Sequence, residues 1–415
     1  MKMLLPDLPQ PSDKLLVSNS IDTKFTHTYQ PSNMKCPILI ATILRPSGST
    51  GVQSHVQSVQ RWLQQSGRRS LIVTPFQSPK WQFYPALGIR RVLDLLSPTA
   101  GVWWYRRGHG FFLGCALTRL LRDGAPCIIY AQCPVSAAAA MAARKSPLQV
   151  IVTVVHFNES HAVEWSNKGA IALNGSLFKA IQKMESQVLP KVDGLIFVSE
   201  FMRQLIQVSV TPCRQIPSRV IPNFTNDQTQ LRLNLPRSGL ITIGTLEPRK
   251  NHRYALEIVF QTKLLGQPLS LTVVGHGPDR AELENLVATW DIQSQVHFTG
   301  FVANAASLMS SHQAYLHVAK MESFGIVLIE AMSHGLPVFA APVGGISEVF
   351  CNGVEGLHIP LNDARAAAVA ILRWINDAEQ MRSAGAAARR TFLEKYEATK
   401  VGTKLVEFLD EIAAR

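Results

Sequence analysis

Glu322 and Glu330 stand eight residues apart and bracket the segment whose residue types are best suited to chemistry. A short apolar run at residues 315–319 predicts a buried strand, and apolar residues then recur at helical spacing up to Gly335. A helix that opens at residues 323–325 would point unpaired backbone N–H groups and the positive end of its dipole beyond the strand. That arrangement suits a phosphate. The segment therefore predicts a site for a sugar and a diphosphate.

The two carboxylates are expected to have separate roles. Glu322 precedes the helix and can accept hydrogen bonds from sugar hydroxyls, whereas Glu330 lies off the centre of the apolar stripe of the helix and can bond a ribose. A single glutamate is more often a solvated surface residue, and only the surrounding pattern argues against that alternative. The residues of this segment expected to contact the ligand are Glu322, Ser323, Phe324, Gly325, Ile326 and Glu330.

A second segment, TIGTLEPRKN at residues 242–251, supplies two cations after another predicted strand. Arg249 can grip phosphate oxygens with a bidentate fork, and Lys250 can act as a point charge. Both stand at a turn that leads into a helix, so they are candidates to neutralise a diphosphate, with Gly244 and Thr245 beside them. The alternative is a pair of surface cations at a helix start.

Two further candidates follow strands in the first half of the chain. Gly51 ends a Gly/Ser loop before a helix whose expected N-cap is Thr50 or Ser49, and glycine there lets the backbone approach a ligand. The loop is not G-x-G-x-x-G, and an ordinary turn is an equal alternative. His156 directly follows the apolar run at residues 150–155, and ligands of open α/β sheets lie beyond the carboxyl ends of strands. A structural histidine is the alternative.

The chain alternates short apolar runs with helical stretches from residue 36 onward, the rhythm of a doubly wound parallel sheet. This rhythm starts afresh after a polar segment within residues 207–239. We therefore expect a flexible leader at 1–34, α/β domains at 35–215 and 216–397, and a final amphipathic helix at 398–415. The predicted strands are residues 37–42, 70–74, 127–131, 150–156, 194–199, 219–221, 240–244, 271–275, 296–299, 315–319 and 338–341.

The composition is that of a globular protein, with 47% hydrophobic and 17% charged residues. Forty-one Lys and Arg against 29 Asp and Glu give a formal net charge of +12, which calls for an acidic partner. No zinc-ligand spacing, RNP motif or basic repeat accompanies the charge, so nucleic acid is not expected as a partner. A nucleotide-linked substrate and anionic lipid headgroups explain the charge better.

Aromatic and basic residues are concentrated at residues 81–122, as a membrane interface requires. The equal alternative is that half of them lie in the core and the arginines are solvated. No apolar run reaches the about 18 residues of a spanning helix, and the first residues lack the apolar core of a signal peptide. The six cysteines show no C-x-x-C pair. We expect a cytoplasmic protein, with peripheral contact at the inner face of the membrane as an option.

Residues 322–345 resemble the E-x7-E element of retaining family-4 glycosyltransferases, whose GT-B fold has two Rossmann-like domains facing a central cleft. The resemblance rests on the preceding strand, the FG pair, EAM, GLPV and the final Gly-Gly. The family's common G-R-L pattern has an arginine where this chain has Thr245, and Arg249 is expected to take over its role. The turns V-G-x-G and F-x-G-x-V, and T-x-H at His156, are also similar. They add Gly275, Phe301 and Val302 to the expected donor-binding residues.

The resemblance implies a retaining, metal-independent hexosyltransferase of polysaccharide or glycoconjugate biosynthesis, with no cofactor. Its second domain would bind a nucleotide-diphosphate sugar and its first a glycan or lipid-linked acceptor. The EPRKN variant favours GDP-mannose over a UDP-hexose. The implied catalytic residues are Glu322, His156, Arg249 and Lys250. The alternatives are a non-catalytic nucleotide-sugar-binding scaffold and a GT-B epimerase. Turnover distinguishes the three, because only a transferase consumes donor in proportion to a glycosylated acceptor.

Overall fold

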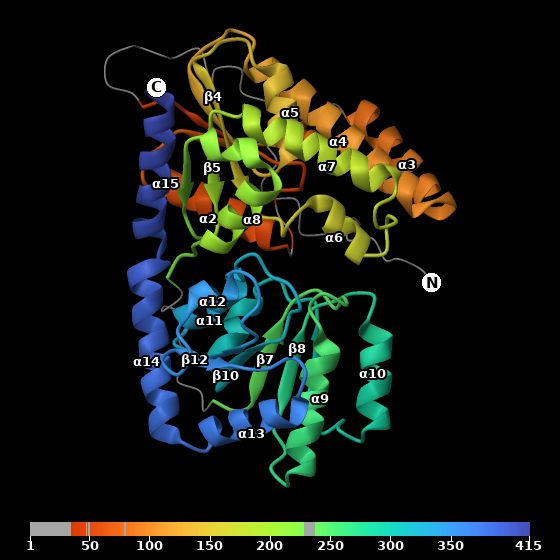
Figure 1. Ribbon diagram of the computed structural model, residues 1–415, viewed down its shortest axis with the longest axis vertical. Coiled ribbons are helices and arrows are strands. Elements are labelled where there is room, and N and C mark those ends of the chain that lie inside the picture. Colours follow the sequence, from red (N-terminus) through yellow and green to blue (C-terminus); the bar gives the residue numbers. More distant parts are fainter. Residues whose placement is uncertain (1–34, 47, 49, 79, 228–236) are drawn as a thin grey trace. The chain divides into compact units, whose positions relative to one another are not determined.

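The computed structural model describes residues 35–415 except 47, 49, 79 and 228–236, and it leaves the side chains of 80–82 and 87 undescribed. The described chain splits into two compact units (Figure 1). The N-terminal unit comprises residues 35–221 with Gly402–Arg415, and the C-terminal unit ends at Val401. The boundary thus lies after Ile221, whereas the sequence pattern places it after residue 215. The leader expected at 1–34 lies outside the described residues.

The N-terminal unit is built on a six-stranded parallel sheet in the order β2-β1-β3-β4-β5-β6. Every residue of β1, β3, β4 and β5 is buried, because helices cover both faces of a parallel sheet, and this explains the unbroken apolar runs in the sequence. All six strands expected in this half are present. They are β1 (Ile38–Ala41), β2 (Ser70–Val73), β3 (Cys127–Ala131), β4 (Gln149–Val155), β5 (Gly194–Phe197) and β6 (Ser218–Val220).

The helices of this unit begin with recognisable signals. Thr50 is the N-cap of the first one, and it shares a capping box with Gln53, whose backbone N–H donates to the Thr50 hydroxyl. Short 3₁₀ turns lie at Pro75–Gln77, Leu189–Lys191 and Thr211–Gln215. The helices are α2 (Gly51–Gln65), α3 (Lys80–Leu96), α4 (Pro98–Leu120), α5 (Pro134–Ala143), α6 (His161–Asn167), α7 (Ser176–Val188) and α8 (Glu200–Ser209).

The C-terminal unit is built on a second six-stranded parallel sheet, in the order β12-β11-β10-β7-β8-β9. The first five of its strands in chain order were expected, and β12, only three residues long, was not. They are β7 (Leu240–Ile243), β8 (Leu271–Val274), β9 (Val296–Gly300), β10 (Ala314–His317), β11 (Val338–Ala340) and β12 (Gly356–His358).

One face of this sheet is covered by α9, α10 and α13, whose apolar residues share a core with β7, β8 and β10. On α9 these include Tyr254, Ala255, Ile258 and Val259, which recur at helical spacing. A 3₁₀ turn lies at Ala305–Ser311. The helices are α9 (His252–Leu264), α10 (Arg280–Thr289), α11 (Ile326–Ser333), α12 (Ile346–Val349), α13 (Ala364–Ile375) and α14 (Ala378–Lys395).

Each sheet has one point where the direction of strand order reverses. In the N-terminal unit this point lies between β1 and β3, and in the C-terminal unit between β7 and β10. Open parallel sheets bind ligands beyond the carboxyl ends of their strands at such a point. The two segments with the strongest chemical signal, residues 244–251 and 318–325, follow β7 and β10. The fold therefore brings them together from distant parts of the sequence.

The last helix, α15 (Ala398–Ala413), is divided between the units. Its residues up to Val401 group with the C-terminal unit, and those from Gly402 onward group with the N-terminal unit. In the latter, Gly402 lies against the ring of Trp62 on α2, and Asp410 forms an ion pair with Arg68 at 2.5 Å.

Candidate active site

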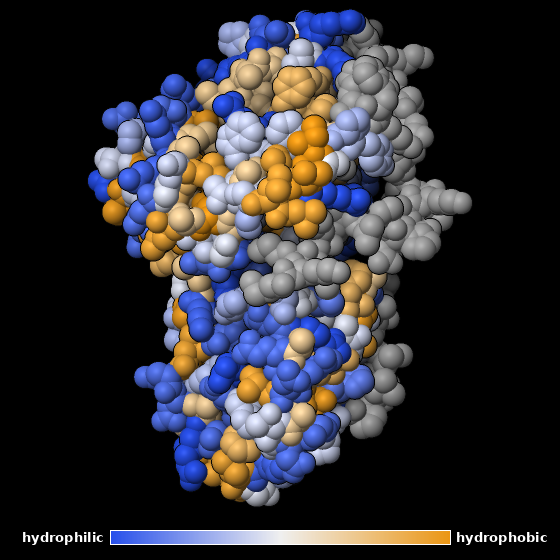
Figure 2. Space-filling view, turned by 90° about the vertical axis from the view of Figure 1, so that its right-hand side faces the viewer, coloured by the Kyte–Doolittle hydropathy of each residue, from blue (hydrophilic) through white to orange (hydrophobic). Residues whose placement is uncertain are grey.

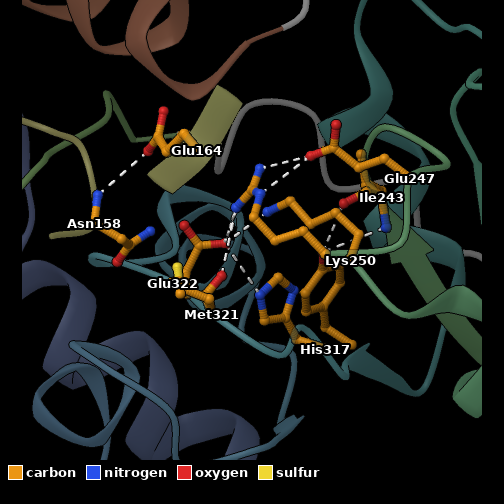
Figure 3. Close-up of polar contacts among 10 residues, drawn as sticks. Asn158, Glu164, Ile243, Glu247, Lys250, His317, Met321 and Glu322 are labelled. Atoms are coloured by element: carbon orange, nitrogen blue, oxygen red, sulfur yellow. Dashed lines mark hydrogen bonds and ion pairs between the residues drawn. The ribbon is translucent and has the colours of Figure 1, made fainter. Parts of the chain in front are cut away.

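An ion pair joins the two segments at the reversal point of the C-terminal sheet. Lys250 Nζ donates to Glu322 Oε2 at 2.6 Å, and both side chains are largely withdrawn from solvent. Figure 3 shows Lys250 and Glu322 turned toward each other beneath the loop that holds Glu247. The backbones are tied as well, because the N–H of Lys320 donates to the carbonyl of Arg249 at 2.9 Å. The predicted cation and carboxylate thus form one site.

Arg249 lies at the same site but has a different main partner. Its guanidinium forms two hydrogen bonds with Glu247 Oε1, at 2.8 and 3.1 Å, and one Nη atom lies 3.8 Å from Glu322 Oε2. The other acceptor is the carbonyl of Met321, at 3.4 Å. Thr245, at the family's usual arginine position, is exposed. Arg249 therefore brings a guanidinium near the carboxylate of Glu322, and its expected role at a diphosphate stays a prediction.

His317 is a member of the site that the sequence did not reveal. It ends β10, is 3% exposed, and its Nε2 lies 3.5 Å from Glu322 Oε2 (Figure 3). Burial lowers the pKa of His317 and outweighs the opposing effect of Glu322, and Lys250 adds to the lowering, so the ring is neutral at pH 7. Burial by itself would raise the pKa of Glu322, but Lys250, His317 and Arg249 outweigh it and hold that pKa well below its usual value.

The loops after β7, β8 and β9 meet beside this ion pair. Gly275 has φ +144°, and a Cβ there would lie 1.9 Å from the carbonyl oxygen of Gly244, so no other residue fits. The N–H of Gly275 donates to the carbonyl of Gly300 at 2.9 Å. Phe301, 57% exposed, and the partly buried Val302 follow directly. The predicted donor-binding turns are thus gathered at one sheet edge.

The segment between the two glutamates forms the start of α11. Gly325 is the N-cap, with φ +84° in the left-handed region, so the chain turns sharply before Ile326. Ser323 and Phe324 are buried, and Phe324 packs edge-on against Tyr396 at 5.8 Å between ring centroids.

Glu330 lies on α11 and is partly buried. Burial raises the pKa of its carboxyl to about 7. Among the described residues no hydrogen bond or ion pair to its carboxylate is present, so its oxygens are open to hydroxyl donors.

His156 follows β4 in the N-terminal unit, at the carboxyl edge of that sheet. Its Nε2 lies 3.2 Å from Oε1 of Gln132, which follows β3, and its ring contacts that of His55 edge-on at 4.5 Å. His55 is itself buried and lies 3.1 Å from the hydroxyl of Tyr130. Gly51, the first residue of α2, is exposed, and part of the loop before it lies outside the described residues.

The hydrogen bonds of Gln132 define the proton positions on His156. The side-chain amide nitrogen of Gln132 donates to the carbonyl of Tyr130 at 3.4 Å. The amide oxygen Oε1 of Gln132 therefore faces the imidazole of His156, and it can only accept a hydrogen bond. His156 therefore carries its proton on Nε2. Burial lowers the pKa of His156 well below its usual value, and His55 and His161 add to the effect, so the ring is neutral and Nδ1 keeps its lone pair.

The expected site residues thus fall into two groups, each within one unit. The larger group lies at the carboxyl edge of the C-terminal sheet. It consists of Gly244, Thr245, Arg249, Lys250, Gly275, Phe301, Val302 and the residues from Glu322 to Glu330. Gly51 and His156 belong to the N-terminal unit. The sequence missed His317, Gln132 and Tyr130. The available signal for His317 was a histidine at the end of a strand, the same signal that identified His156.

Two family models match the chain side by side. The model described as Glycosyl transferase 4-like domain matches residues 50–223, and that described as Glycosyl transferases group 1 matches residues 223–391. The solved structure of sucrose-phosphate synthase from Thermosynechococcus elongatus aligns with 92% of this chain and 100% of its own, with TM-score 0.69 and 19% identity. The chain belongs to the glycosyltransferases that the two family models describe, which together match residues 50–391. Its fold is GT-B. Another GT-B structure, HepE (Alr3699) from Anabaena in complex with UDP and glucose, covers 91% of this chain and 99% of its own, with TM-score 0.63 and 19% identity.

Curated relatives of this glycosyltransferase match over part of its length. N-acetyl-alpha-D-glucosaminyl L-malate synthase of Bacillus anthracis is 31% identical over 181 residues, 43% of this chain and 48% of the relative. The phosphatidylinositol N-acetylglucosaminyltransferase GPI3 subunit of Saccharomyces cerevisiae (strain YJM789) is 25% identical over 183 residues, 41% of this chain and 40% of the relative. The matches thus span less than half the length of these two relatives.

Proposed function

We propose that this glycosyltransferase moves a hexose, with retention of configuration, from a nucleotide-diphosphate sugar to a glycan or lipid-linked sugar. The observation that carries the proposal is the partly buried cluster of Lys250, Arg249 and Glu322 at the reversal point of the C-terminal sheet. It places cations beside the carboxylate of the E-x7-E element, in the half of the chain that the group 1 model matches. Two adjacent cations are suited to a diphosphate leaving group.

In this proposal the bond from the sugar's anomeric carbon to the diphosphate oxygen breaks with its electron pair left on the diphosphate. Lys250, Arg249 and the backbone amides at the start of α11 stabilise the negative charge that develops. These groups take the place of a metal ion. The acceptor oxygen bonds to the anomeric carbon on the same face, and its proton passes to an oxygen of the departing phosphate.

The remaining site residues hold the substrate in place. Glu322, paired with Lys250 and 3.5 Å from His317 Nε2, accepts hydrogen bonds from the sugar hydroxyls, and Glu330 accepts from the ribose. Phe301 and Val302 contact the base. By the family resemblance, His156 supports the sugar or its developing charge. The N-terminal unit binds the acceptor.

Two donors are candidates. The EPRKN segment favours GDP-mannose, and the UDP bound to HepE, which shares the fold, supports a UDP-hexose. The transferred hexose serves polysaccharide or glycoconjugate assembly, at the cytoplasmic side of a membrane when the acceptor is lipid-linked. Intact Lys250, Glu322 and Glu330 argue against the non-catalytic scaffold.

The test is a thermal-shift screen with GDP, UDP, ADP and their common sugars, followed by donor turnover with candidate acceptors. A ligand at about 100 times its dissociation constant adds roughly 2.7 kcal/mol to stability. One nucleotide family should raise the melting temperature of the wild type and shift that of the control variant Lys395→Met, at an exposed position on α14, equally. The variant Lys250→Met should lose the shift. If Lys250→Met kept the full increase in melting temperature, the cluster of Lys250, Arg249 and Glu322 would not be the site that binds the diphosphate.

A further inference from the structure

The hairpin of α3 and α4 in the N-terminal unit exposes large apolar side chains. Leu95 is 87% and Leu96 78% exposed at the end of α3. Single exposed hydrophobic residues are ordinary, but a group of them marks a surface that another phase or molecule covers. We call the following seven residues the hairpin patch: Tyr84, Ile89, Val92, Leu95, Leu96, Trp103 and Phe111.

The members of the hairpin patch recur at helical spacing. On α3, Tyr84, Val92 and Leu95 differ by eight and three residues and lie along one face, with Ile89 and Leu96 at its flank. On α4, Trp103 and Phe111 are separated by two helical turns. Figure 2 shows hydrophobic side chains gathered next to hydrophilic ones on the side of the N-terminal unit that carries this hairpin. Each helix therefore presents a face, not scattered residues.

The charges around the patch are almost all positive. Asp94 is the one acidic residue in the sequence between residues 80 and 122, and it pairs with Arg90 at 3.4 Å. Arg91 and Arg107 are exposed, and no carboxylate in the described chain forms an ion pair with them. The guanidinium of Arg107 lies 5.9 Å from the centre of the Trp103 ring. Apolar side chains and uncompensated cations thus share one surface.

The sequence left open whether residues 81–122 form a membrane interface or lie partly in the core. In the structure some of them are buried and others are exposed. Phe83 is buried, and Trp104 Nε1 donates to the carbonyl of Ala86 at 2.7 Å inside the hairpin. Arg106 is also withdrawn from solvent, and this burial lowers the pKa of its guanidinium. Arg106 is therefore part of the interior, whereas its neighbour Arg107 belongs to the exposed face.

We propose that the hairpin patch rests on an anionic lipid bilayer, with α3 and α4 lying in the interface. Aliphatic and aromatic side chains enter the headgroup region while Arg91 and Arg107 bind lipid phosphates. Nucleic acid would attract the arginines but would leave Leu95 and Leu96 exposed to water. No helix in the described ranges is long and apolar enough to cross a bilayer, so the contact is peripheral. This proposal rests on the N-terminal unit alone and not on the proposed transfer reaction.

Vesicle flotation of the full chain tests the proposal. Vesicles of phosphatidylcholine and phosphatidylglycerol in equal parts should carry the wild type, and pure phosphatidylcholine should carry at least about tenfold less. The double variants Leu95→Glu/Leu96→Glu and Arg91→Glu/Arg107→Glu should each weaken binding to the mixed vesicles at least about tenfold. The matched controls are Leu264→Glu and Arg373→Glu, two exposed positions in the C-terminal unit, which should bind as the wild type does.

The outcomes of these experiments distinguish a lipid bilayer from a second copy of the chain as the partner of the hairpin patch. Equal flotation of the wild type and both hairpin variants would overturn the proposal. So would a wild-type dimer that Leu95→Glu/Leu96→Glu converts to a monomer without any vesicle binding, because the patch would then join two copies. Melting curves confirm that each variant is folded. Nucleotide-induced thermal shifts on the same variants should equal the wild-type shift, so a failure here is distinct from a failure of the proposed activity.

Discussion

Lys250 Nζ and Glu322 Oε2 lie 2.6 Å apart although the two residues are 72 positions apart in the sequence. Their loops follow β7 and β10, which are hydrogen-bonded neighbours in the sheet. Breaking a buried ion pair by removing one partner leaves the other charge uncompensated, which costs more than the pair itself contributes. The pair is therefore both a feature of the site and a condition for the fold around it.

Lys250→Met should destabilise the protein more than Glu322→Gln, because it leaves the 9% exposed carboxylate of Glu322 without its principal cation. We expect a loss of about 3 kcal/mol for Lys250→Met. The double variant should regain part of this loss. Urea unfolding of the four proteins gives the coupling free energy. Additive effects of the two substitutions would show that the pair is not formed.

Acid stability should reflect the same carboxylate. The pKa of Glu322 in the folded protein lies below its ordinary value of 4.5, so its contribution to stability is present above that value and is lost as the pH falls below it. The stability difference between wild type and Glu322→Gln should therefore shrink between pH 6 and pH 3. Melting temperatures across this range measure it, and a constant difference would contradict the assignment.

Glu330 should make nucleotide binding depend on pH near neutrality. Its carboxyl has a pKa of about 7, so the fraction that can accept from both ribose hydroxyls increases as the pH rises through 7. Affinity for the nucleotide should increase over this range in the wild type and stay flat in Glu330→Gln. Because the unfolded carboxyl ionises at a lower pH, Glu330→Gln should also raise the melting temperature more at pH 8.5 than at pH 5.5. Titration calorimetry at several pH values measures the affinity for the nucleotide in both proteins.

Gln132→Glu should raise the pKa of His156, because a carboxylate would replace the neutral amide oxygen 3.2 Å from its Nε2. Nuclear magnetic resonance titration of the imidazole nitrogens reports both the pKa and the tautomer. In the wild type, the ring should be neutral at pH 7 with its proton on Nε2. Gln57→Glu adds the same charge on α2 and should leave His156 unchanged. A proton on Nδ1 in the wild type would refute the assigned hydrogen bond.

Gly275→Ala should be severely destabilising, by about 3 kcal/mol or more, because a Cβ would meet the carbonyl oxygen of Gly244. Gly266→Ala is the matched control. Gly266 also has a positive φ, +74°, but nothing lies within 4 Å of its Cβ position. It should cost only the backbone strain of about 1–2 kcal/mol. Denaturant melts compare the two, and equal losses would mean that the approach of the two loops does not limit the choice of residue.

The sequence predicted the strands best where both faces are buried. β3 was predicted with its observed bounds because the run from Cys127 to Ala131 is uninterrupted and apolar. β12 was missed because three residues carry too little pattern. The pairing of Lys250 with Glu322 was not predicted, because 72 positions separate them and only the pairing of β7 with β10 brings them together. Composition could not separate the exposed from the buried residues of 81–122, because neighbours such as Arg106 and Arg107 lie on different sides of one helix.

The divided helix α15 has a consequence for the order in which this protein folds. The ion pair of Arg68 with Asp410, and the contact of Trp62 with Gly402, join an early part of the described chain to residues that follow the C-terminal unit in the sequence. Residues 402–415 are translated after the whole C-terminal unit. The N-terminal unit precedes the C-terminal unit in the sequence, so its apolar surface beneath residues 402–415 stays uncovered until the C-terminal unit has been translated, and exposed surface of this kind favours aggregation.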